Sequence, residues 1–183
     1  MARNIEIKAR IASISTLEPK VAALAQHGPE LIEQDDTFFH CAHGRLKLRA
    51  FADGRGELIA YERPDTLGPK TSNYLITPTA NPDSLRTTLA RALGEAGSVK
   101  KQRVLFLVGR TRVHLDHVDG LGEFLELEVV LRDGEAAEAG VDEAHALLLQ
   151  LGVQPASLIA GAYIDLLNAH AQSHPGHAAR AAG

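Results

Sequence analysis

Apolar and charged residues alternate along one short segment after another of this chain, and this alternation limits the folds open to it. In the segment GRLKLRA, Arg45, Lys47 and Arg49 occupy every second position, with leucines between them. Because successive side chains of a β-strand point to opposite faces, such a segment forms a strand with one charged and one apolar face. Near the N-terminus RNIEIKARI repeats the pattern, with Glu6 and Lys8 on one face. The chain is therefore predicted to form a sheet with two chemically distinct faces.

The predicted strands follow one another as hairpins, separated by turn sequences such as AHG, ADGRG and PDTLGP. Strands are predicted at residues 3–11, 31–40, 44–51, 56–64, 71–79, 99–109, 110–118 and 122–132. Helices are predicted at residues 13–28, 81–94, 135–152 and 155–170. Consecutive hairpins favour an antiparallel sheet over alternating βαβ units. We therefore predict an α+β fold, in which an antiparallel barrel or strongly curved sheet carries helices on its outside.

The charges on these strands sort by sign instead of mixing, which is unusual for a solvated face. The basic residues are Arg45, Lys47, Arg49 and Arg63 in one region and Lys101 and Arg103 in another; Arg110, Arg112, His114 and Asp116 share one face of a further strand, and Glu126 and Glu128 share a face of the last one. Like charges this close repel each other unless a bound multivalent ion compensates them. Clustered Arg and Lys suit a polyphosphate, and clustered carboxylates suit Mg²⁺ or Mn²⁺. A solvated face is the simpler interpretation of any single strand, but the whole set favours a charged lining that faces a ligand.

The composition excludes several classes of protein. The net charge of −4 argues against a non-specific nucleic-acid binder, and a single cysteine, Cys41, excludes a disulfide framework within the chain. No run of 18 apolar residues is present, and the N-terminal segment lacks the apolar run of a signal peptide. We expect a cytoplasmic monomer or homodimer without a membrane or nucleic-acid partner. One domain is expected over residues 1–169, followed by a disordered tail over residues 170–183.

Taken in order, these segments resemble the CYTH domains, also called triphosphate tunnel metalloenzymes, which include class IV adenylate cyclases, thiamine triphosphatases and inorganic tripolyphosphatases. The family opens with a strand of pattern ExExK, and here Asn4, Glu6 and Lys8 stand at its three positions. GRLKLR, YERPD with the following TSNY, the KxR pair, TRVHLD and GLGEFLELE resemble the family's successive tunnel strands. The resemblance covers roughly residues 3–168 and implies an eight-stranded antiparallel β-barrel whose tunnel binds a triphosphate.

The resemblance also implies a role for each charged group. The triphosphate would contact basic residues, namely Lys8, Lys47, Arg49, Arg63, Lys101, Arg103 and Arg112. One or two Mg²⁺ or Mn²⁺ ions would contact Glu6, Asp116, Glu126 and Glu128, and the catalytic set would be Glu6, Lys8, Asp116 and Glu128. The metal would align the triphosphate and lower the pKa of an attacking water, while the basic residues offset charge on the leaving phosphate. Asn4, in place of the first acid, can coordinate a cation through its oxygen but adds no charge.

We predict a metal-dependent phosphohydrolase that acts on inorganic tripolyphosphate, thiamine triphosphate or a nucleoside triphosphate. Aromatic residues suited to stacking on a base are few, namely Phe38, Phe39, Tyr61 and Tyr74, which favours a small or inorganic substrate. The first alternative is a class IV adenylate cyclase, which would convert ATP to cyclic AMP and pyrophosphate. The others are a non-catalytic polyphosphate or nucleotide binder, which Asn4 permits, and a structural β-domain.

Several further residues have two interpretations. His114 is either a hydrogen-bonded lining residue or an acid or base near the phosphates. Tyr163 either packs a helix or closes the tunnel mouth. Lys70 and Ser72 are secondary candidates for contacts with the ligand. The HCAH sequence at residues 40–43 has no second ligand pair at a zinc-binding spacing and is interpreted as incidental.

Overall fold

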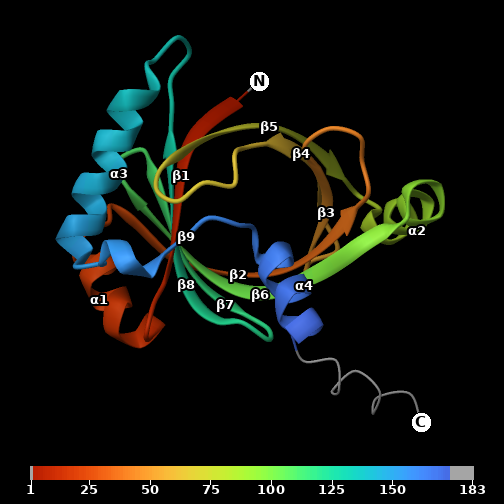
Figure 1. Cartoon of the computed structure of the whole chain (residues 1–183), viewed down its shortest axis with the longest axis horizontal. Coiled ribbons are helices and arrows are strands. Elements are labelled where there is room, and N and C mark those ends of the chain that lie inside the picture. Colours follow the sequence, from red (N-terminus) through yellow and green to blue (C-terminus); the bar gives the residue numbers. More distant parts are fainter. Residues whose placement is uncertain (1, 174–183) are drawn as a thin grey trace.

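Eight strands close into a barrel in the computed structural model of the chain, which describes residues 2–173 (Figure 1). The barrel strands are β1 (Ala2–Arg10), β2 (His27–Phe39), β3 (Arg45–Phe51), β4 (Gly56–Glu62), β5 (Lys70–Thr79), β6 (Glu95–Val108), β7 (Thr111–Val118) and β8 (Gly122–Val130). Their order around the ring is β5-β4-β3-β2-β6-β7-β8-β1, and β1 pairs again with β5. Every one of these pairings is antiparallel. The predicted eight-stranded antiparallel barrel is confirmed.

A short ninth strand completes the edge of β1. Residues 2–6 of β1 pair with β5, and the last of these pairs joins Glu6 to Lys70. Farther along the same edge, Lys8 and Ala9 pair with β9 (Leu158–Ile159). The opposite edge of β1 pairs with β8 over residues 4–10. The charged first strand is therefore held on both edges by hydrogen-bonded neighbours.

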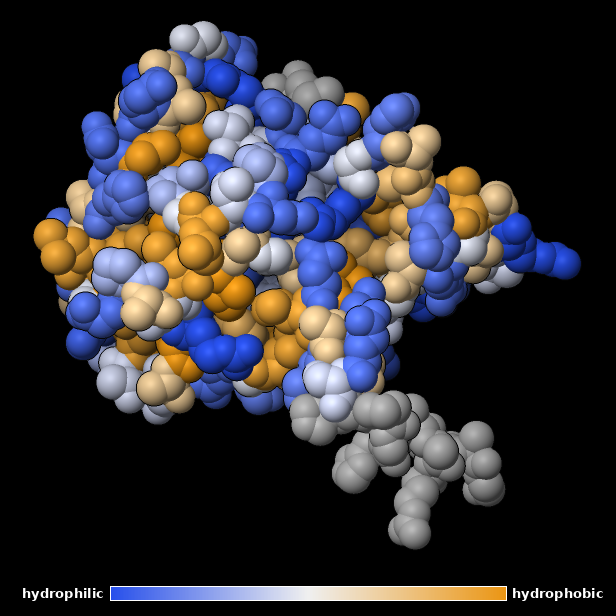
Figure 2. All heavy atoms as spheres, viewed as in Figure 1, coloured by the Kyte–Doolittle hydropathy of each residue, from blue (hydrophilic) through white to orange (hydrophobic). Residues whose placement is uncertain are grey.

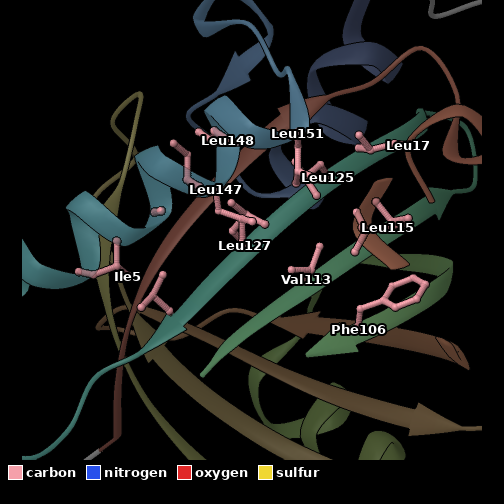
Figure 3. Close-up of a cluster of buried hydrophobic side chains, with 14 of the residues drawn as sticks. Ile5, Leu17, Phe106, Val113, Leu115, Leu125, Leu127, Leu147, Leu148 and Leu151 are labelled. Carbon is pink, nitrogen blue, oxygen red and sulfur yellow. The ribbon is translucent and has the colours of Figure 1, made fainter. Parts of the chain in front are cut away.

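Two helices cover the outside of the barrel where the strands present their apolar faces. α1 (Ile14–Leu24) and α3 (Ala137–Leu151) pack against β1, β6, β7 and β8 (Figures 1 and 3). The buried cluster between helices and strands includes Ile5, Ile7, Leu115, Leu125, Leu127, Leu147, Leu148 and Leu151. Gly140 allows α3 to approach β1 closely, because a Cβ at this position would lie 2.6 Å from Cγ1 of Ile5. With the apolar faces packed outward under helices, the charged faces line the inside of the barrel.

A third helix, α2 (Pro82–Leu93), packs at the edge of the barrel against β2 and β3. It begins as predicted, since the side-chain oxygen of Asn81 accepts a hydrogen bond from the backbone N–H of Ser84 (3.2 Å) and Pro82 is its first residue. Among residues 2–173, no helix combines the length and the apolarity that crossing a membrane requires.

The segment after α3 differs from the single helix predicted over residues 155–170. It forms a 3₁₀ turn at Pro155–Ser157, then β9, and only then α4 (Tyr163–Ser173). The edge of β1 beyond the end of β5 is free to pair, and Leu158 and Ile159 occupy it. Tertiary pairing thus overrides the local helical pattern of this stretch.

The last helix starts and ends at positions other than those predicted. At its start, the Asp165 side chain accepts a hydrogen bond from the backbone N–H of Ala162 (2.8 Å), which caps the helix after Gly161. At its end, α4 runs to Ser173, past the domain boundary predicted at residue 169. The rest of the predicted tail, residues 174–183, lies outside the described residues.

Candidate functional site

The barrel encloses a cavity of about 320 Å³, and side chains from all eight strands line it together with Ala162 and Tyr163. Seven Lys and Arg side chains and five Asp and Glu side chains face this space. Predicted site residues in the lining are Glu6, Lys8, Lys47, Arg49, Arg63, Lys101, Arg103, Arg112, Glu126 and Glu128. In Figure 2 the area framed by the strands is mainly blue and white, and orange residues gather on the side of α1 and α3. The charged strand faces therefore surround an interior space with a surplus of positive charge.

One side of the cavity, here named the cationic wall, consists of Asp36, Lys47, Arg49 and Lys101 from β2, β3 and β6. Asp36 accepts hydrogen bonds from Lys47 Nζ (2.8 Å) and from Nε and Nη2 of Arg49 (2.8 and 2.9 Å). Lys101 Nζ lies 4.0 Å from the same carboxylate. Burial alone would raise the pKa of Asp36, but Arg49, Lys47 and Lys101 hold it well below its usual range. One buried anion thus organises three cations that face the cavity.

Sequence reasoning missed Asp36. It lies in the strand predicted at residues 31–40, and the alternation test would have placed it on one face with Gln34 and Phe38, both of which also line the cavity. This strand carries two adjacent aspartates, Asp35 and Asp36, which point to opposite faces, and it therefore lacks the repeated charge at every second position that marks the other strands.

Lys101 on this wall has an unusual proton affinity. Its side chain is buried, and burial together with the neighbouring Arg103 lowers its pKa to about 7. The ammonium group is therefore only partly protonated near neutral pH. A bound polyanion would favour the charged form and raise this pKa.

The facing side, here named the carboxylate wall, consists of Glu6, Glu126, Glu128 and His114, with Lys8 and Arg112 between them. The register of β1, β8 and β7 sets Glu6 beside Glu128 and Arg112 in one row, and Lys8 beside Glu126 and His114 in the next. Lys8 Nζ lies 3.5 Å from both Glu6 and Glu126. Arg112 donates to Oε2 of Glu128 (2.8 Å). Antiparallel pairing of three alternating strands is what gathers these acids.

The two glutamates of β8 differ in proton affinity. Burial would raise the pKa of Glu126, but Lys8 and Arg103 outweigh it and hold that pKa well below the usual range. Glu128 has a raised pKa, because burial is only partly offset by Arg112 and Glu126 adds repulsion. The pKa of His114 is lowered well below its usual value by burial and by Arg103, so the imidazole is neutral. A cation beside this wall would stabilise both glutamates in their charged form.

Asp116 lies behind the lining and not in it. Its oxygens accept two hydrogen bonds from Arg103, each 2.6 Å long, and one from the Tyr163 hydroxyl (2.9 Å). Burial would raise the pKa of Asp116, but Arg103 and Lys101 hold it below its ordinary value. Asp116 therefore fixes the guanidinium of Arg103, which also reaches Oε2 of Glu126 (3.2 Å).

The N-terminal turn of α4, which lies beside the barrel in Figure 1, borders the cavity with Ala162 and Tyr163. Lys8 Nζ lies 4.1 Å from the centre of the Tyr163 ring, and the Phe124 ring lies 4.9 Å from it. Tyr163 therefore packs α4 and also lines the cavity, with its hydroxyl on Asp116, whereas its closure of the tunnel mouth stays a prediction. Lys70 does not reach the cavity: its ammonium donates to the backbone carbonyls of Thr66 (2.9 Å) and Ala160 (2.7 Å). Ser72 does line it.

Several polar atoms in the lining lack a partner, and they fit a divalent cation. Among residues 2–173, His114, Glu126 and Glu128 form the group of His, Cys, Asp and Glu side chains whose ligand atoms lie close enough to share one ion. The buried Oδ1 of Asn4 and Nδ1 of His114 have no hydrogen-bond partner. Carboxylate, amide and imidazole are donors that divalent metals accept. The HCAH residues at 40–43 do not belong to this group.

Arg110, which was predicted on the charged face of β7, lies outside the cavity in the turn before this strand. Arg110 was expected to share a face with Arg112 and His114, but it lies in the β6–β7 turn and pairs with Glu135 and Glu143 on the barrel exterior. A turn residue does not follow the alternation of the strand that begins after it.

Known proteins share this architecture. The adenylate cyclase CyaB of Aeromonas hydrophila is 25% identical to the chain over 175 residues, which cover 89% of the chain and 87% of that protein. The PH1012 protein of Pyrococcus horikoshii OT3 superposes with a TM-score of 0.79 at 22% identity, over 89% of this chain and 98% of that one. An adenylyl cyclase candidate from Hippeastrum, described as having a dominant triphosphatase activity, superposes with a TM-score of 0.64 at 16% identity, over 93% and 96% of the two chains. The CYTH domain matches residues 2–163, and the chain therefore belongs to the CYTH domain family.

Proposed function

We propose that the chain is a divalent-metal-dependent phosphohydrolase that cleaves a triphosphate bound inside the barrel. The observation that carries this proposal is the division of one enclosed cavity between a cationic wall and a carboxylate wall. An inorganic or organic triphosphate carries several negative charges at short spacing, which match the Arg and Lys side chains of the lining. The Hippeastrum relative with a dominant triphosphatase activity supports the same reaction class.

In this proposal the basic residues of the lining contact the substrate, and two aspartates hold the arginines in position. Lys47, Arg49 and Lys101 contact phosphate oxygens from the cationic wall, and Lys8, Arg63, Arg103 and Arg112 contact them from the other sides of the cavity. Their charges stabilise the leaving phosphate as negative charge develops on it. Asp36 and Asp116 hold Arg49 and Arg103 in place, so the guanidinium groups need little reorganisation when the substrate binds.

The metal belongs to the carboxylate wall. Glu126 and Glu128 would hold Mg²⁺ or Mn²⁺, with Glu6 beside them, and the ion would supply Lewis-acid activation of a phosphate or water oxygen when bound. In the sequence-based prediction Asp116 was also a metal ligand. We now assign it the positioning role, because both of its oxygens are already engaged by Arg103 and Tyr163.

A second candidate activity is adenylate cyclisation, and one observation favours it. Ile32, Phe51, Ile76 and Leu105 line the same cavity as the charges, and Ile76 is 45% exposed to solvent. These side chains offer an apolar surface to an organic group attached to the triphosphate. Inorganic tripolyphosphate has no apolar group that could pack against this surface. The relative from Aeromonas hydrophila carries the name of an adenylate cyclase.

One assay series distinguishes these activities. Purified protein is incubated with Mg²⁺ or Mn²⁺ and with tripolyphosphate, thiamine triphosphate or ATP, and orthophosphate, pyrophosphate and cyclic AMP are measured in the same samples. Orthophosphate without cyclic AMP is the expected result. Equal amounts of pyrophosphate and cyclic AMP from ATP would identify an adenylate cyclase and contradict the hydrolase proposal. Binding of a triphosphate with no product would leave a non-catalytic binder.

A further inference from the structure

His114 faces the two glutamates of β8. The pairing of β7 with β8 puts His114 directly opposite Glu126, and one ligand atom each from His114, Glu126 and Glu128 lie within 4.8 Å of one another. Two ligands on opposite sides of a small dication, each about 2.1–2.3 Å from it, are about 4.2–4.6 Å apart. One ion can therefore contact all three side chains after small adjustments.

Each of the two glutamates has one carboxylate oxygen that no group of residues 2–173 hydrogen-bonds. Oε2 of Glu126 accepts a hydrogen bond from Arg103, and Lys8 Nζ lies 3.5 Å from the same oxygen. Arg112 likewise donates to Oε2 of Glu128. Oε1 of either glutamate accepts no hydrogen bond from any of residues 2–173. The cations thus orient both carboxylates and leave one oxygen of each available.

The imidazole of His114 gives a second indication of a ligand, which does not depend on the distances between the three side chains. His114 is only 4% exposed, lines the cavity, and its Nδ1 makes no hydrogen bond within the described part of the chain. A buried ring nitrogen without a partner is unfavourable unless a ligand satisfies it. On β7 the next lining residue is Arg112, whose guanidinium is engaged by Glu128 and by the Tyr74 hydroxyl, so the strand offers no competing partner to the imidazole.

We propose that His114 is the third protein ligand of the metal held by Glu126 and Glu128, and that its nitrogen makes the site prefer Mn²⁺ over Mg²⁺. This inference rests on the metal site of the proposed function and adds its selectivity. Mg²⁺ strongly favours oxygen ligands and keeps its waters, whereas imidazole suits first-row transition metals. Three protein ligands leave further coordination positions open, and triphosphate oxygens or water can fill them.

The test measures Mn²⁺ binding to the full-length protein in the absence of any triphosphate. Electron paramagnetic resonance gives the affinity, with Mg²⁺ as competitor, and electron spin echo modulation detects a ¹⁴N nucleus bound to Mn²⁺. We expect the ¹⁴N signal in the wild type and its loss in His114→Gln. Changing even an outer partner of a metal ligand lowers metal affinity about 10–100-fold, so the affinity for Mn²⁺ should fall at least about tenfold in this variant. The affinity for Mg²⁺ should fall less, because Mg²⁺ gains little from a nitrogen ligand, and the preference for Mn²⁺ should shrink accordingly.

His117→Gln is the matched control. His117 lies on the same strand, but it is exposed and faces Glu123 outside the cavity, so its substitution should preserve both the ¹⁴N signal and the metal preference. If His114→Gln fails to fold, the wild-type spectrum alone still decides, because ¹⁵N-histidine labelling must change the modulation of a histidine-bound ion.

Two outcomes would overturn the inference: Mn²⁺ bound without ¹⁴N modulation in the wild type, or modulation that persists in His114→Gln. Both would leave the proposed phosphohydrolase standing with oxygen ligands alone. Conversely, a histidine-bound Mn²⁺ in a protein that cleaves no triphosphate would support the site and contradict the proposed function. The two failures are therefore distinguishable.

Discussion

On the cationic wall one carboxylate, Asp36, is shared by three cations, whereas on the carboxylate wall three glutamates share four, namely Lys8, Arg63, Arg103 and Arg112. Both oxygens of Asp36 are engaged, so this wall has positive charge to spare and no free acceptor. The carboxylate wall differs in that one oxygen each of Glu126 and Glu128 and one imidazole nitrogen have no hydrogen-bond partner among residues 2–173. The first wall suits an anion and the second a cation. The cavity as a whole therefore fits a polyanion together with its metal.

The largest effect is expected from Asp36→Asn, which removes the only anion of the cationic wall. Leaving buried charges unpaired costs about 3–5 kcal/mol, so the free energy of unfolding in denaturant should fall by about that amount. Added tripolyphosphate should restore part of it, because the ligand binds only the folded state. Asp53→Asn, which breaks an exposed pair with Arg55, serves as the control and should change stability little. A variant as stable as the wild type would mean that the cations do not depend on Asp36.

The second largest effect, a loss of metal-dependent turnover, is expected from Glu128→Gln on the carboxylate wall. Loss of a charged metal ligand should lower metal-dependent turnover at least about a hundredfold while leaving metal-free tripolyphosphate binding nearly unchanged. Calorimetric titration and a phosphate release assay measure the two quantities separately. Glu143→Gln is a suitable control, since that acid pairs with Arg110 on the outside. Wild-type turnover in Glu128→Gln would remove this residue from the metal site.

The complementary change on the cationic wall is Arg49→Met. A charged hydrogen bond contributes about 1.5–3 kcal/mol, so the affinity for tripolyphosphate should fall about 10–100-fold. The affinity for Mn²⁺ without substrate should stay the same, because Arg49 belongs to the other wall. The same two titrations test this, and an equal loss of both affinities would break the distinction between the walls.

The smallest expected effect is the pH dependence of tripolyphosphate binding. The Lys101 pKa of about 7 means that its amine is mostly neutral at pH 8, and a bound polyanion favours the protonated form. Binding of tripolyphosphate at pH 8 should therefore take up about one proton, and affinity should fall by up to about tenfold from pH 8 to pH 9. Lys101→Arg keeps its charge and should lack both effects. Calorimetry in two buffers of different ionisation enthalpy measures the uptake, and equal uptake in the variant would assign the proton to another group.

The sequence predicted the barrel because alternation is a local property. Ile5 and Ile7 on one side of β1 and Glu6 and Lys8 on the other already define which face packs under α3 and which lines the cavity. The same test found nearly all of the cavity's Arg, Lys and Glu residues. It works because a strand has a fixed period, whatever its neighbours are.

What the sequence could not predict depends on contacts between distant segments. The alternation rule puts Asp116 on the charged face of β7, but only the fold brings Arg103 and Tyr163 onto both of its oxygens. Likewise, residues 158–159 have a helical pattern, and they form a strand because β5 stops short and leaves the edge of β1 open. Pairing across the chain decides both cases, and periodicity contains no information about it.

The most direct test of the two-wall account is a crystal structure with tripolyphosphate and Mn²⁺, recorded with anomalous scattering at the manganese edge. If metal and polyanion bind together between the two walls, an anomalous peak lies beside Glu126 and Glu128, and phosphate density extends from it to Arg49 and Lys101 on the opposite wall. A manganese peak outside the barrel, or a tripolyphosphate bound on the outer surface, would contradict this arrangement.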